Sequence, residues 1–238
     1  MLFFCFATLK GVQAQHSTQF WAEYQFDYPF ANVYLYEATV SYQTLMTANP
    51  QNKWWSVALS NTFEYSIEPK LDLTAEIPIG YTLQKENANS FEVSPLIGAR
   101  YYFSQGKRFD IRFLLRYQHR FFRTIDEDLW EKSNRVRLRG EAWISLTGPN
   151  MFTDNLWYSF LDYEEFVVVD EQVNERFANR RRLRVGIGYR LNYMHRFDLG
   201  YTWQSSRNEI GGAFISDDSV IQFKYKMYLN PSGIAASR

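Results

Sequence analysis

The sequence has a single cysteine, Cys5, which lies close to the start of the chain. Disulfide frameworks and thiolate metal sites need several cysteines in a defined spacing, so both are excluded. The apolar run around Cys5 ends in Val12-Gln13-Ala14 and resembles the end of a secretory signal peptide without its basic n-region. We expect residues 1–14 to be a signal peptide and residues 15–238 to form one domain. A short hydrophobic first strand is the alternative, which is less favoured because the run does not alternate.

Long hydrophobic runs and a surplus of one charge are also missing. No stretch of about 18 apolar residues occurs, which excludes a helical membrane protein. The 26 Lys and Arg residues balance the 26 Asp and Glu residues, whereas nucleic-acid-binding domains are clearly basic. The three histidines are dispersed and lack the spacing of metal ligands. We therefore expect no nucleic-acid partner, no metal and no cofactor.

Aromatic residues, by contrast, make up 18% of the chain and alternate with polar residues. The alternation is clearest in residues 109–121 and 180–191, where large apolar residues occupy one parity and arginine occupies the other. Residues two apart share one face of a strand, so each segment has an apolar face and a basic face. The same pattern recurs along most of the chain, and a chain of such strands must close its edges or aggregate.

The size of the apolar side chains indicates which face points outward. Residues such as Phe20, Tyr24 and Phe26 recur in segment after segment, and a barrel interior of ordinary radius cannot hold so many large side chains. They must face lipid, while Ser, Thr, Gly, Arg and Glu face a polar lumen. The sequence therefore predicts an all-β fold, a single up-and-down antiparallel transmembrane β-barrel in the outer membrane.

Eleven segments carry the alternation, and short connections alternate with longer or more charged ones. The segments are residues 18–26, 33–44, 54–66, 71–82, 91–104, 109–121, 134–147, 156–168, 179–192, 196–205 and 219–229. Bacterial single-chain barrels normally have an even number of strands, so either one of these segments does not span the membrane or a further strand was missed. The sequence therefore predicts 10 to 12 strands without deciding among these numbers. The weakest segment is 156–168, where a parity change near Asp162 predicts a bulge or an inward bend.

Several motifs together resemble the DUF2490 family of outer-membrane proteins. They are Trp21, RVRLR at residues 135–139, YEEF at 163–166, RRRLRVGIGY at 180–189 and DLGY at 198–201. The resemblance spans about residues 18–229. It implies an outer-membrane β-barrel in a Gram-negative bacterium, and it supplies no activity.

Charged residues of the inward parity are the candidate site residues. The early segments contribute mainly carboxylates and the middle and late segments mainly arginines, so we expect one acidic and one basic wall. The lumen-lining candidates are Arg112, Arg116, Arg137, Arg139, Glu141, Arg182, Arg184, Arg190, Glu76 and Glu92.

Three functions are compatible with these residues. The favoured hypothesis is structural: ion-pair networks fill a narrow lumen, with arginine forks meeting carboxylates. The first alternative is a porin-like channel whose basic track guides small anionic solutes such as acidic sugars. The second is an outer-membrane lipid-modifying enzyme with a triad on the lipid-facing wall. Outer-membrane lipids are the expected partner of the barrel in every case. His119 has the outward parity, but its neighbouring segments offer no outward serine or carboxylate, so we expect no catalytic residue.

Overall fold

A computed structural model describes residues 17–46, 53–84, 89–125, 128–170, 179–207 and 215–229. The expected signal peptide and its cleavage site at Ala14 lie outside these residues. The strands are β1 (Ser17–Phe30), β2 (Tyr34–Leu45), β3 (Trp54–Glu68), β4 (Leu71–Gln84), β5 (Ser90–Val93), β6 (Leu96–Ser104), β7 (Phe109–Thr124), β8 (Leu129–Ser145), β9 (Leu156–Val168), β10 (Asn179–Arg190), β11 (His195–Arg207) and β12 (Ile215–Tyr228). None of the described residues forms a helix that is long and apolar enough to cross a membrane.

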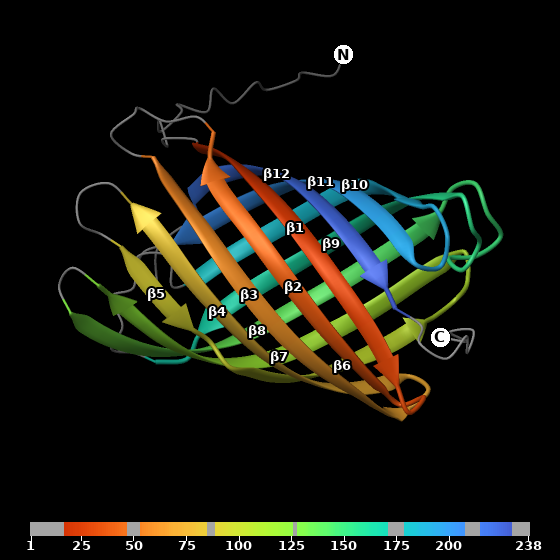
Figure 1. Ribbon diagram of the computed structural model, residues 1–238, viewed down its shortest axis with the longest axis horizontal. Helices are drawn as coiled ribbons and strands as arrows, with labels where there is room; N and C mark the ends of the chain where they lie inside the picture. Colours follow the sequence, from red (N-terminus) through yellow and green to blue (C-terminus); the bar gives the residue numbers. More distant parts are fainter. Residues whose placement is uncertain are drawn as a thin grey trace, which may run out of the picture.

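The strands close into a single up-and-down barrel, as the sequence predicted (Figure 1). Neighbours along the chain pair in antiparallel fashion, and β1 pairs with β12 to complete the ring. β5 and β6 both lie between β4 and β7 and together form one stave of the wall, where a stave is one full-length strand position. The wall thus has eleven staves, one for each predicted segment and within the expected range. The inference that one segment does not span or was missed is wrong. Because chain direction alternates, the first and eleventh staves run the same way. The β1–β12 pair is therefore parallel, which is how an odd number of staves closes.

Two prolines explain why one stave consists of two strands. Pro95 separates β5 from β6, and Pro78 of β4 lies opposite this break. Proline has no N–H group to donate between strands, so regular pairing is interrupted where the two approach each other. The backbone N–H groups of Ser94 and His119 still donate to the carbonyls of Pro78 and Pro95, both at 3.0 Å. These bonds keep the stave continuous across the break.

The bulge or bend predicted near Asp162 is wrong. β9 pairs with β8 and with β10 without a register shift, and its inward residues keep one parity throughout. The apparent parity change arises because Tyr158 and Phe160 point inward although they are aromatic. They are accommodated by inward glycines on β10: a Cβ on Gly186 would lie 2.2 Å from the Phe160 ring.

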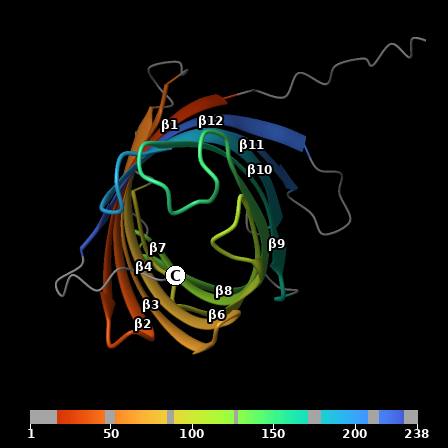
Figure 2. The same cartoon turned by 90° about the vertical axis from the view of Figure 1, so that its right-hand side faces the viewer.

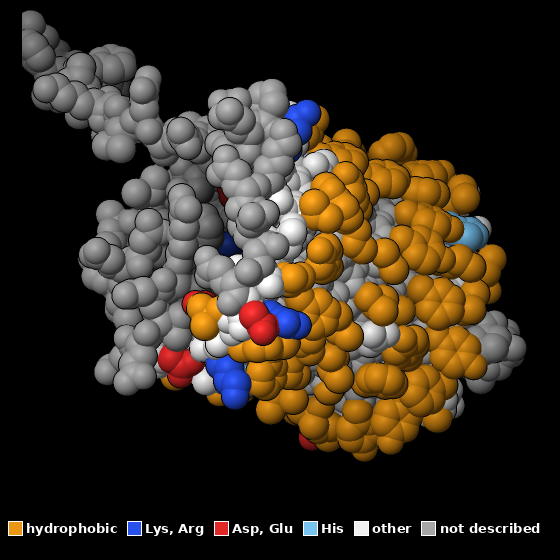
Figure 3. All heavy atoms as spheres, turned by 60° about the vertical axis from the view of Figure 1, so that its left-hand side comes forward, with side chains coloured by type: hydrophobic (Ala, Val, Ile, Leu, Met, Phe, Trp, Pro, Cys, Tyr) orange, Lys and Arg blue, Asp and Glu red, His pale blue; other side chains and the backbone are white. Residues whose placement is uncertain are grey.

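The outer wall of the barrel is apolar. Outward side chains on adjacent strands, such as Val40, Leu59 and Ile79, lie side by side in the register and are all exposed. Figure 3 shows hydrophobic side chains covering one side of the barrel, with most charged side chains in view near one end. Exposed apolar surface on this scale is unfavourable in water and is typical of transmembrane-type β-barrels.

The two ends of the barrel differ in their connections. We call them the Ser17 end, where β1 begins, and the Phe30 end, where β1 ends. The connections alternate between the two ends, as the sequence predicted, and the longer or more charged ones at the Ser17 end lie partly outside the described residues. The connections at the Phe30 end are residues 31–33, 69–70, 105–108, 146–155 and 191–194.

Candidate functional site in the barrel lumen

The lumen encloses a cavity of about 2500 Å³. Its lining includes Gln84 and Glu131 near the Ser17 end as well as Pro69 and Tyr193 at the Phe30 end. Among the described residues that line it, fifteen are Lys or Arg and sixteen are Asp or Glu. The cavity therefore extends along the whole barrel and is close to neutral overall.

The charges are separated between two walls. In the described part of the chain, β1 to β4 contribute seven carboxylates and no Lys or Arg to the lining. β7, β8 and β10 together contribute ten arginines and three acids. The period of two places these residues on the inward face of each strand, and the strand order collects the arginine-rich strands on one side.

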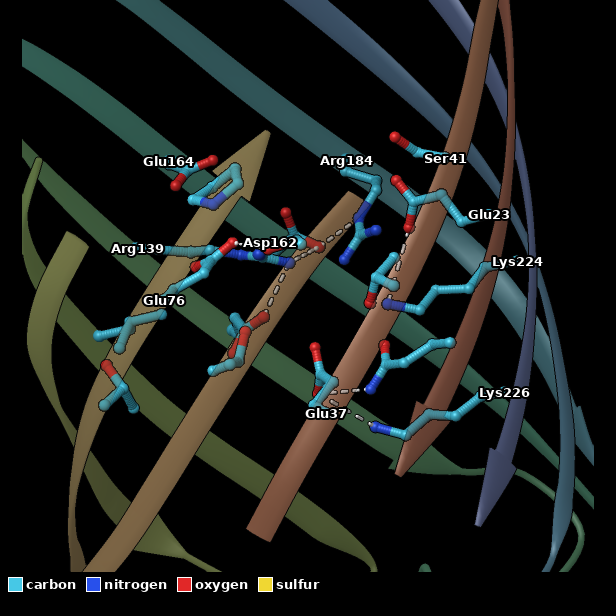
Figure 4. A pocket seen from close by; sticks show the side chains of 18 of the residues that line it. Glu23, Glu37, Ser41, Glu76, Arg139, Asp162, Glu164, Arg184, Lys224 and Lys226 are labelled. Atoms are coloured by element: carbon cyan, nitrogen blue, oxygen red, sulfur yellow. Dashed lines mark hydrogen bonds and ion pairs between the residues drawn. The ribbon is translucent and has the colours of Figure 1, made fainter. Parts of the chain in front are cut away.

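The structure places all the sequence-predicted candidates on this lining. Arg112, Arg116, Arg137, Arg139, Glu141, Arg182, Arg184, Arg190, Glu76 and Glu92 all face the cavity. Seven of them join Asp162 and Glu164 in a network centred on the basic wall, which we call the ion-pair belt. Its members are Glu76, Arg112, Arg116, Arg137, Arg139, Glu141, Asp162, Glu164 and Arg184. Figure 4 shows part of it, with Glu164, Arg139, Asp162 and Arg184 on one side of the cavity and Glu23, Glu37, Lys224 and Lys226 on the other.

Glu164 of β9 holds one half of the ion-pair belt. One of its carboxylate oxygens accepts from Arg116 at 2.7 Å and from Arg137 at 2.8 Å. Arg116 also reaches Glu76 of β4 at 3.1 Å. Glu164 is 4% exposed, so its charge is shielded from water and depends on these guanidinium groups.

Glu141 and Asp162 hold the other half of the belt. Glu141 accepts from Arg112 and forms an ion pair with Arg139 at 2.8 Å. Asp162 forms ion pairs with Arg184 at 2.6 Å and with Arg139 at 3.5 Å. Each carboxylate is thus shared by two arginines, an arrangement that restricts all these side chains to the wall.

A second network on β1, β2 and β12 was missed by the sequence reasoning. Lys226 lies 2.9 Å from Asp27 and 4.0 Å from Glu37, and Lys224 lies 3.6 Å from Glu23. The lysines have the inward parity of β12, which was a usable signal. Their partners could not be inferred because the parallel β1–β12 pairing joins residues about 200 positions apart.

The ion pairs run along the wall of the barrel. Arg137–Glu164, Arg184–Asp162 and Lys226–Asp27 join adjacent strands. Arg116–Glu164 and Arg116–Glu76 each bridge two strands separated by one stave. None of these pairs crosses the lumen, so together they line the cavity and do not fill it.

An aromatic cluster lies toward the Ser17 end of the basic wall. The guanidinium carbons of Arg135, Arg137 and Arg182 lie 5.4, 4.6 and 4.9 Å from the centre of the Phe166 ring. The Arg182 guanidinium is also 5.2 Å from the ring of Trp21 on β1. Such distances allow cation–π attraction between each guanidinium and a ring.

The Phe30 end of the lumen is narrowed by the connection between β8 and β9. Figure 2 shows this green segment, residues 146–155, lying across the opening. Met151 is 6% exposed and packs against Leu156, Tyr158 and Phe160. Arg190 donates to the Met151 carbonyl at 2.8 Å, which ties the connection to β10.

His119 faces outward near the Ser17 end and has polar neighbours that the sequence reasoning missed. Its Nδ1 lies 2.5 Å from Oδ1 of Asn134, and Nδ2 of Asn134 donates to Asp170 at 3.0 Å. Asn134 has the outward parity of β8, and Asp170 lies two residues beyond the end of β9. In the described part of the chain no serine or threonine hydroxyl hydrogen-bonds to His119, so the enzyme hypothesis lacks a nucleophile there. No group of three or more described His, Cys, Asp or Glu side chains is arranged to hold a metal ion.

A family model described as a protein of unknown function (DUF2490) matches residues 18–213. The chain belongs to the DUF2490 family. The match includes every stave except β12, so Lys224 and Lys226 lie beyond the matched region while their partners on β1 and β2 lie within it. A search of curated proteins found no match.

Proposed function

We propose that this DUF2490 protein is an outer-membrane β-barrel whose water-filled lumen passes small solutes and favours anions. In this proposal the ion-pair belt has a structural role, because it holds neighbouring staves together. The remaining space of the lumen is the path for solutes. The proposal thus combines the two uses of lumen charge that the sequence suggested.

The apolar outer wall supports the location. Outward positions along β2, β3 and β4 carry large apolar side chains in register, as a lipid-facing surface requires. Outward aromatic residues also gather near strand ends: Tyr34 stacks on Tyr65 at the Phe30 end with ring centres 5.1 Å apart. Tyr and Trp are enriched where a membrane protein meets the interface with water.

The observation that carries the transport proposal is the path of the ion pairs along the wall. A packed lumen would need charged groups that meet across the barrel. Here they join adjacent or next-adjacent staves, and a cavity of about 2500 Å³ is lined from one end of the barrel to the other. The ten arginines on β7, β8 and β10 favour anions because rings and tracks of arginine select anions in pores.

Reconstitution in planar lipid bilayers tests the proposal. In a potassium chloride gradient we expect stable conductance steps and a reversal potential of the sign for anion preference. Arg182→Glu should weaken that preference, and Arg181→Glu is the matched control because Arg181 pairs with Glu165 on the outer face. An intact barrel that never conducts would contradict the transport proposal, and the ion-pair belt would then have a structural role only. Cation preference would contradict the anion assignment.

A further inference from the structure

Arg135 and Arg182 differ from the arginines of the ion-pair belt in having no carboxylate partner. Arg135 donates through Nε to Gln118 at 2.8 Å, and Arg182 donates through Nε to Gln204 at 2.8 Å. Among the described residues, neither guanidinium lies within ion-pair distance of an acidic side chain. Arg135 is only 8% exposed, so its charge is largely withdrawn from bulk water. A buried charge in this situation favours a bound counter-ion.

Phe166 of β9 lies between these two arginines in the sheet. In the strand register Phe166 lies between Arg137 of β8 and Arg180 of β10. Arg135 is two residues from Arg137 on the β8 side, and Arg182 is two residues from Arg180 on the β10 side. Their Nε atoms donate to the glutamines and their guanidinium carbons lie 5.4 and 4.9 Å from the Phe166 ring centre. With respect to the described residues, the terminal nitrogens of each fork remain available as donors.

This arrangement suits an organic anion more than a simple halide ion. A guanidinium fork matches the two oxygens of a carboxylate, and charge-assisted bonds of this kind are stronger than neutral ones. Trp21, whose ring lies 5.2 Å from the Arg182 guanidinium, lines the cavity and offers apolar surface to the body of the ligand. Across the lumen, β2 and β3 present Ser41, Ser56 and Ser60, whose hydroxyl groups can bond to a polyhydroxylated solute.

We propose that Arg135 and Arg182, placed on either side of Phe166, form a binding site for a carboxylate-bearing solute of monosaccharide size. The site rests on the proposed function for its access to solute through the lumen. The site adds two things to that function: the carboxylate as the chemical group that is recognised, and Arg135 and Arg182 as the residues that contact it.

Isothermal titration calorimetry on the detergent-solubilised full chain tests the site without requiring permeation. The probes are glucuronate and glucose, which share a sugar ring and differ in the carboxylate. We expect saturable binding of glucuronate and no measurable binding of glucose. Arg135→Gln and Arg182→Gln should each weaken glucuronate binding about tenfold or more, because each removes a charge-assisted contact. Arg181→Gln, on the outer face of the same strand, should leave binding unchanged.

Equal binding of the two sugars, or no binding of either, would overturn the site, and this comparison needs no variant. A loss in Arg181→Gln as large as that in Arg182→Gln would also overturn it. The bilayer measurement separates the two proposals. Anion-selective conductance without glucuronate binding would overturn the binding site and support the transport proposal. Glucuronate binding without conductance would support the binding site and contradict the transport proposal.

Discussion

Leu59→Arg, compared with Ala58→Arg, tests which face of the barrel meets lipid. Leu59 lies in the middle of β3 and is 42% exposed, and its register neighbours Val40 and Ile79 are outward and apolar. Ala58 precedes it on the same strand but lines the lumen, between Ser41 and Gly80 in the register. The same new side chain is thus placed one residue apart, on opposite faces of the wall.

The expected costs differ because the surroundings differ. Arginine on the lipid face of a β-barrel costs about 2–4 kcal/mol at the bilayer midplane and little near the interfaces. Leu59 is central in its strand, and neither register neighbour is acidic, so we expect about 3 kcal/mol for Leu59→Arg. Ala58→Arg places the guanidinium in a polar cavity of about 2500 Å³. There we expect less than about 1 kcal/mol, because lumen substitutions mainly change selectivity.

Urea titrations of the protein folded into lipid vesicles measure both values, as the shift in midpoint multiplied by the common slope. The folded fraction can be followed by the different gel mobility of unheated and heated barrels. If Ala58→Arg were as costly as Leu59→Arg, or more so, the assignment of the outer face would be refuted and the apolar parity would have to face inward.

Two further variants test the lumen. Glu164→Gln should cost about 3 kcal/mol in the same titration, because Arg116 and Arg137 both lose their shared buried carboxylate. Glu165→Gln, on the outer face, is the control and should cost less than about 1 kcal/mol. Equal costs for the two variants would contradict a structural role of the ion-pair belt. Gly186→Ala should destabilise by about 1–3 kcal/mol, since its Cβ would meet the Phe160 ring at 2.2 Å and the Leu199 carbonyl oxygen at 2.5 Å. Gly140→Ala, where the new Cβ meets nothing within 4 Å, should be close to neutral, and a reversed order would contradict the inward packing of Phe160.

The sequence by itself determined the class of fold and the two faces of its wall. Alternation is a local property: once a segment is extended, neighbouring side chains must point to opposite faces. Residues 109–121 therefore reveal an apolar face and an arginine face whatever their partners are. Volume then indicates which face is outside. For the same reason the predicted lumen candidates could be read strand by strand from parity alone.

Only the tertiary structure decided what depends on register and closure. The parity of β9 could not be read locally, because Phe160 fits inward only where Gly186 of the next strand leaves room for its ring. The odd number of staves requires a parallel contact between the two ends of the chain, and that contact also brings Lys226 to Asp27. The placement of Arg135 and Arg182 around Phe166 likewise depends on the alignment of three strands. Alternation specifies the direction of a side chain, whereas its partners follow from pairing between residues far apart in the chain.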